Sequence, residues 1–125
     1  MKSKNVEMPE DVVQELFEAL LLVKTTEEMN SFFKDLCTPQ EIRALAERWR
    51  VCKILNEGTL SYREINKETG ASLATIGRVA RFLKEEPHHG YQMVLDRMQK
   101  KKLKQISLIY LVVSIKMIMK KVFCV

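Results

Sequence analysis

The sequence is short of cysteine and lacks the spacing that disulfide or zinc proteins show. Its three cysteines, Cys37, Cys52 and Cys124, are odd in number and have neither CxxC nor Cys/His ligand spacing. Neither a disulfide framework nor a zinc site is expected, and a reducing, cytoplasmic setting fits best. The charged segment 1–16 has no apolar core followed by small residues, so we do not expect it to be a secretory signal.

Catalytic and metal-binding motifs are missing as well. The chain contains no nucleophile with an adjacent base, no glycine-rich phosphate loop and no HExxH motif. His88 and His89 follow Pro87 without a carboxylate or cysteine at ligand spacing, which favours a surface turn over a metal site. The sequence therefore predicts neither an enzyme nor a metalloprotein.

Strand patterns and prolines are scarce, and helix-forming residues dominate. Prolines occur only at positions 9, 39 and 87, and no segment before residue 105 alternates apolar and polar residues. These features predict an all-α class with one domain plus tails in 125 residues. The expected domain is 1–102, followed by a basic and apolar tail, 103–125.

Capping signals and apolar spacing locate the helices. Thr38 with Glu41, and Ser61 with Glu64, have the spacing of capping boxes, while Gly58 and Gly70 can take the left-handed conformation that ends a helix. The predicted helices cover about 9–24, 25–36, 39–56, a short helix between Ser61 and Gly70, a helix from Ser72 to about Glu86, and about 91–102.

The first predicted helix is apolar around most of its circumference. Its apolar residues recur at spacings of three and four, and Leu21 and Leu22 widen the stripe. A domain of this size covers such a helix poorly, whereas a partner subunit covers it well. Trp49 fits a core or dimer-interface position better than base stacking, which would need an exposed loop.

Positive charge is concentrated at one end of the chain. Residues 1–96 carry a net charge of −3, whereas residues 97–125 carry eight basic residues and no acid. The uncharged run 105–115 is 11 residues long, and a membrane span needs about 20. This tail could lie at a membrane surface, extend a dimer core or have little function. The last two are favoured, and a membrane partner is not expected.

Two short helices separated by "TGA" have the form of a helix-turn-helix, at about 61–86. Ile65, Ala71, Ile76 and Val79 occupy positions that would pack between the helices, although Asn66 stands where a small residue is usual and would loosen that packing. The outward face of the second helix would approach a DNA groove closely because its residues are small. The predicted face consists of Ser72, Leu73, Ala74, Thr75, Gly77, Arg78 and Arg81, and Lys84 adds a third cation to a segment, 72–84, that has no acid.

Residues 32–98 resemble the tryptophan repressor superfamily, and more closely its YerC/YecD-type branch. The motifs that carry the resemblance are "FFKDLCTPQEIRALAERWRVCKILNEG", "SYREINKETGAS", "ATIGRV" and "GYQMVLDRM". The resemblance implies an all-helical, intertwined homodimer that binds double-stranded DNA through two helix-turn-helix units. It matches Arg63 to a phosphate contact, and it places Leu73, Ala74, Thr75 and Arg78 at or near DNA.

The resemblance also implies a ligand site. Thr38, Arg48 and Arg78 match positions around the tryptophan corepressor, although Arg48 could instead pair with an acid on a neighbouring helix. Val79 replaces a glycine and Phe82 a small serine of the tryptophan repressors, and both add bulk to the cavity. L-tryptophan is therefore not expected to bind, and no cofactor is expected.

Two functions follow from these observations. The first is a sequence-specific, dimeric DNA-binding regulator, a repressor that excludes polymerase from a pseudo-palindromic operator. The second is a helical protein-interaction adaptor whose apolar tail associates with a membrane surface. Substitution of Arg78 and Arg81 separates them, because only the regulator would lose salt-dependent DNA binding.

Overall fold

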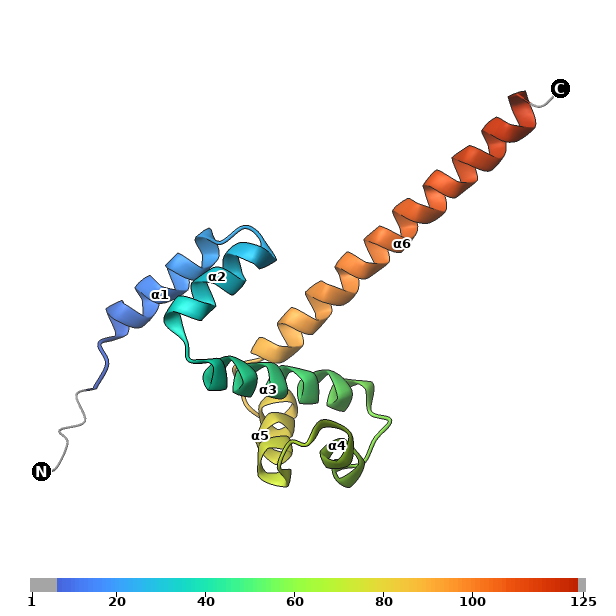
Figure 1. Cartoon of the computed structure of the whole chain (residues 1–125). Coiled ribbons are helices and arrows are strands. Elements are labelled where there is room, and N and C mark those ends of the chain that lie inside the picture. The colour runs from blue at the N-terminus through green and yellow to red at the C-terminus, as the bar shows by residue number, and fades with distance from the viewer. Residues whose placement is uncertain (1–6, 124–125) are drawn as a thin grey trace, which may run out of the picture. The chain divides into compact units, whose positions relative to one another are not determined.

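The computed structural model describes residues 7–123, and within them the chain forms six α-helices and no strand (Figure 1). The prediction of an all-α class is confirmed. The helices are α1 (Glu10–Leu22), α2 (Thr26–Leu36), α3 (Pro39–Glu57), α4 (Tyr62–Thr69), α5 (Leu73–Lys84) and α6 (Gly90–Phe123).

The chain divides into two compact units, Met1–Ala46 and Glu47–Val125. In the first unit, Thr25 caps α2 by accepting a hydrogen bond from the Glu28 N–H at 3.1 Å. The Glu28 carboxylate accepts from the Lys24 N–H at 2.9 Å, one residue before the position that a capping box would use. Helix α2 therefore begins where the predicted range 25–36 places it.

The start of α3 is a complete capping box. The Thr38 hydroxyl accepts from the Glu41 N–H at 3.2 Å, and the Glu41 carboxylate accepts from the Thr38 N–H at 2.7 Å. The hydrogen bond from the Thr38 backbone, aided by the one from its hydroxyl, lowers the pKa of Glu41. Thr38 and Glu41 thus start the helix as the sequence predicts.

The core lies in the second unit and surrounds α5. Helix α5 packs against α4 on one side and against α6 on the other. Trp49, Tyr91 and Leu95 are partly buried and pack against the edge of the core. The buried residues of this core are Val51, Cys52 and Leu55 of α3, Ile65 of α4, Ala71 between α4 and α5, and Ile76, Val79 and Ala80 of α5.

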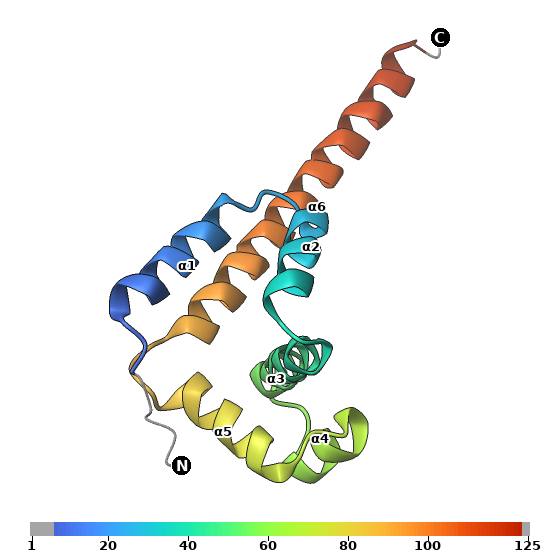
Figure 2. The same cartoon turned by 60° about the vertical axis from the view of Figure 1, so that its left-hand side comes forward.

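The prediction of a helix that ends near residue 102 is wrong, because α6 continues without interruption to Phe123 (Figure 2). No glycine or proline follows Gly90, so nothing in the backbone ends the helix where the composition changes. None of the residues of α6 is buried. Among residues 7–123, no helix combines the length and apolar character needed to cross a membrane.

Candidate nucleic-acid interface

The turn between α4 and α5 is fixed by local hydrogen bonds and one left-handed glycine. The Ser61 hydroxyl accepts from the Glu64 N–H at 3.3 Å, while the Glu64 carboxylate accepts from the Ser61 N–H at 2.7 Å. The hydrogen bond from the Ser61 N–H to the carboxylate, aided by one from the Ser61 hydroxyl, lowers the pKa of Glu64. Gly70 ends α4 with φ of 76°, a conformation that side chains other than glycine rarely adopt.

Asn66 stabilises this turn. Its side-chain amide donates to the Ala71 carbonyl at 2.7 Å, and the Thr69 hydroxyl accepts from the Ala71 N–H at 3.1 Å. Both polar groups of the Ala71 backbone are thereby satisfied although the residue is fully buried. The expectation that Asn66 loosens the packing is wrong, because Ile65 and Ile76 also have no exposed surface.

Helix α5 has one buried and one open face. Ile76, Val79 and Ala80 are buried in the core, whereas Leu73 is 53% exposed. Ser72 caps the helix by accepting from the Thr75 N–H at 3.1 Å, and the hydroxyls of Ser72 and Thr75 are 3.0 Å apart. The open face carries Ser72, Leu73, Ala74 and Arg78, with Thr75 and Gly77 partly buried beside them.

The cations of α5 are exposed but have neighbours. The guanidinium carbon of Arg78 lies 4.6 Å from the centroid of the Phe82 ring, and that of Arg81 lies 5.3 Å from it. The Arg81 Nε is 3.3 Å from a carboxylate oxygen of Glu86. Glu86 lies just beyond the segment 72–84, so the positive charge of this face is partly offset. Lys84, in the last turn of α5, is exposed.

Arg63 lies in the first turn of α4 and is exposed. Because α4 packs directly on α5, Arg63 belongs to the same compact unit as the open face of α5. The second unit thus holds all the residues that the sequence predicts at DNA.

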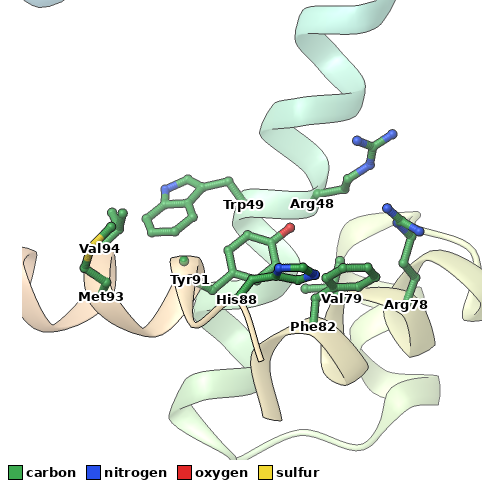
Figure 3. Close-up of a pocket in the computed structure, with 10 residues that line it drawn as sticks. Arg48, Trp49, Arg78, Val79, Phe82, His88, Tyr91, Met93 and Val94 are labelled. Atoms are coloured by element: carbon green, nitrogen blue, oxygen red, sulfur yellow. The ribbon is translucent and has the colours of Figure 1, made fainter. Parts of the chain in front are cut away.

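A cavity of about 550 Å³ opens beside α5 in the same unit. In Figure 3 the guanidinium groups of Arg48 and Arg78 lie at one side of it, and Trp49, Met93 and Val94 lie at the other. Its remaining lining residues are Val79, Phe82, His88, Gly90 and Tyr91. Volumes of this size are typical of small-molecule sites.

Aromatic residues form part of the wall of this cavity. The rings of Phe82 and His88 are stacked, with centroids 6.0 Å apart and planes 12° apart. Burial raises the pKa of Tyr91, and nearby Cys52 adds to that rise while Arg48 and Arg78 oppose it. Helical periodicity did not predict His88 and Tyr91 at this cavity, because the loop after α5 brings them back onto that helix.

Two of the three predicted ligand residues lie at this cavity. Arg48 and Arg78 line the same cavity. Thr38 belongs to the other compact unit, where its hydroxyl donates to the Glu41 carboxylate at 3.0 Å. Among residues 7–123 the ion pairs are Arg50 with Glu68 and Arg81 with Glu86, so the alternative pairing of Arg48 with an acid is not observed.

Known proteins resemble this chain over most of its length. The uncharacterized protein YerC of Bacillus subtilis (strain 168) is 46% identical over 87 residues, which are 70% of this chain and 82% of YerC. A candidate Trp repressor from Staphylococcus aureus, of known crystal structure, is 43% identical with a TM-score of 0.66, over 71% of this chain and 87% of that one. The crystal structure of a TrpR-like protein from Eubacterium eligens ATCC 27750 gives 42% identity and a TM-score of 0.67, over 71% and 90%.

The match extends from α1 into the first turns of α6. The family model described as Trp repressor protein covers residues 11–99, which include the helix-turn-helix and leave out most of α6. With this match, and with relatives above 40% identity, the chain belongs to the Trp repressor family.

Proposed function

We propose that the protein is a sequence-specific, DNA-binding transcriptional regulator. The observation that carries this proposal is the two-sided α5, whose inner face is buried in the core while its outer face is open and built from small side chains and arginine. A major groove about 12 Å wide admits an α-helix, and small residues let its backbone approach the base edges. The Gly70 turn and the Asn66 hydrogen bond hold α5 at a fixed angle to α4.

Base and phosphate contacts divide among the exposed residues. Leu73 and Ala74 offer apolar contact to a thymine methyl, and Thr75 offers a hydroxyl to a base or phosphate. Arg78 reaches guanine O6 and N7 or a phosphate, because its guanidinium is a bidentate donor. The remaining polar residues, Arg63, Ser72, Arg81 and Lys84, contact the phosphate backbone and set the register.

The regulator acts as a homodimer on a pseudo-palindromic operator. One recognition helix reads only a few base pairs, and two-fold symmetry places a second one about one DNA turn away. Apolar side chains of α1 that the single chain leaves exposed, such as Phe17 and Leu21, supply a surface for the partner subunit. Occupancy of a promoter operator would exclude polymerase, so repression is the simplest outcome.

The first test is DNA binding by the full chain. Selection from a random DNA pool should yield a palindrome, and Arg78→Ala should weaken binding to that site roughly 10–100-fold, since a bidentate base contact is worth about 1–3 kcal/mol. Fluorescence anisotropy at several salt concentrations measures both affinity and salt slope. Arg81→Ala should lower the slope by about one phosphate contact.

Arg50→Ala is the matched control for these arginine substitutions. Arg50 is an exposed arginine of α3 that pairs with Glu68 at 3.9 Å and is not among the predicted DNA contacts. Its loss should leave affinity and specificity unchanged. Absence of salt-dependent DNA binding in the unmodified protein would contradict the proposal and support the adaptor function instead.

The cavity beside α5 is not expected to bind L-tryptophan. The Phe82 ring already occupies the stacking position at the Arg78 guanidinium, and Val79 reduces the space next to it. Isothermal titration of the protein with millimolar L-tryptophan should therefore give no heat of binding. Binding with a micromolar dissociation constant would contradict this prediction and would indicate that Phe82 moves aside for the ligand.

A further inference from the structure

Residues 97–123 of α6 carry charge of one sign on an exposed helix. Arg97, Lys100, Lys101, Lys102 and Lys104 form a basic cluster. Three more lysines follow at positions 116, 120 and 121, and no acid occurs between 97 and 125. At about 1.5 Å per residue, such a helix is roughly 40 Å long. Because none of α6 is buried, this charge is available to a partner.

Beyond residue 104, α6 is apolar around most of its circumference, and the side farthest from the lysines at 116, 120 and 121 forms a continuous apolar stripe. Residues at 108, 111, 115, 118 and 122 are spaced by three and four, so they share one side of the helix. Lys116, Lys120 and Lys121 lie about 100–160° around the axis from the middle of this stripe, at about 100° per residue. The stripe consists of Leu108, Leu111, Ile115, Ile118 and Val122, with exposed fractions of 61%, 57%, 47%, 61% and 62%.

We propose that residues 97–123 bind the surface of a membrane that contains anionic phospholipids. The basic cluster is complementary to phosphate and carboxylate headgroups, and the apolar stripe can enter the boundary between headgroups and acyl chains. Long lysine stems let the ammonium groups of Lys116, Lys120 and Lys121 reach the headgroups while the stripe is immersed. A bilayer surface therefore accommodates both the charge and the apolar residues.

Insertion across the bilayer does not fit this segment. Its uncharged run, 105–115, has 11 residues and is about 16 Å long as a helix, whereas the hydrocarbon core is about 30 Å thick. The helix would thus lie on the membrane rather than cross it.

A second copy of α6 is a poorer partner. In a coiled coil of two α6 helices, the apolar stripe at 108, 111, 115, 118 and 122 would form the interface. One seven-residue repeat toward the N-terminus, that interface would contain Lys101 and Lys104. The apolar stripe itself covers about two seven-residue repeats, whereas stable coiled coils have apolar interfaces of at least three or four repeats. The helix also has no acid that could pair with the lysines of its twin. The phosphates of DNA would be complementary to the lysines, but DNA would leave the apolar stripe exposed to water.

This proposal goes beyond DNA binding and does not depend on it. Residues 100–125 lie outside the match to the family model, so the helix-turn-helix and the membrane-binding segment occupy different parts of the chain. The sequence alone favoured a dimer extension or little function. The continuous helix changes that interpretation because it places the lysines and the apolar stripe at fixed positions on one uninterrupted helix.

Vesicle flotation of the full chain tests the proposal. The protein should float with vesicles of phosphatidylcholine and phosphatidylserine and much less with phosphatidylcholine alone. Joint replacement of Lys100, Lys101 and Lys102 with glutamine should lower partitioning about 100-fold, since each lysine near an anionic surface contributes roughly fivefold. Ile115→Ser with Ile118→Ser should lower it at least about tenfold.

The control removes two apolar residues from the other side of the same helix. Val113→Ser with Met117→Ser, at residues 50% and 61% exposed, should retain most of the flotation. Circular dichroism checks that each variant stays helical. The proposal is overturned by absence of flotation with anionic vesicles, by equal flotation with neutral ones, or by equal losses in the two serine pairs. It is also overturned if Ile115→Ser with Ile118→Ser dissolves an oligomer while no variant binds vesicles, because the partner would then be a second copy.

Discussion

Ile76→Ala is expected to lower the free energy of unfolding by about 2–5 kcal/mol. Ile76 has no exposed surface and lies where α5 packs against the rest of the core. The substitution removes three buried carbons and leaves a cavity, and among the described residues seven other buried core residues are available to close it. Chemical denaturation followed by circular dichroism measures the loss. Protein concentration must be held constant, because the proposed dimerisation would add to apparent stability.

Leu73→Ala is the matched control for this prediction. Leu73 lies three residues earlier on α5, and 53% of it is exposed. Its truncation should change the free energy of unfolding by about 0.5 kcal/mol or less, which is usual for surface positions. In DNA binding the order should reverse, since Leu73 lies on the proposed DNA-facing side of α5 and Ile76 does not. Equal destabilisation by the two substitutions would contradict the two-sided arrangement of α5.

Features that depend on residues three or four apart were predictable from the sequence. The capping boxes at Thr38 and Ser61 and the left-handed conformation of Gly70 are observed where the sequence placed them. Each involves hydrogen bonds or dihedral angles within one turn of helix, so local spacing determines it. The buried positions Ile65 and Ile76 follow from helical periodicity in the same way.

Features that depend on the path of a loop were not predictable. The pair of Arg81 with Glu86 and the stack of Phe82 with His88 arise where the chain turns after α5. Periodicity says nothing about such a turn, so neither contact could be predicted, although His88 is exposed in a turn as the sequence predicts. The length of α6 differs from the prediction because no residue after Gly90 breaks the helix, which therefore continues beyond residue 102 to Phe123.

Leu21→Asp is expected to weaken the proposed homodimer more than 100-fold. Leu21 is 85% exposed in the single chain, so the substitution leaves the packing of its own subunit almost unchanged. In a dimer that covers this face, the new carboxylate would be buried without a partner, and a penalty of about 3 kcal/mol already corresponds to more than two orders of magnitude in affinity. Sedimentation velocity over a range of concentrations measures the shift.

DNA binding should report the same change through avidity. A monomer offers one recognition helix instead of two, and loss of the second linked contact typically costs about 10²–10⁴ in affinity without any change at the groove. Glu15→Gln is the control, because it also changes the charge of α1 by one unit, but at an exposed position about 120° around the helix axis from Leu21. It should leave both dimer and DNA affinity intact. If Leu21→Asp remained a dimer with unchanged operator affinity, the exposed face of α1 would not be the subunit interface, and two-fold recognition would have to arise from another surface.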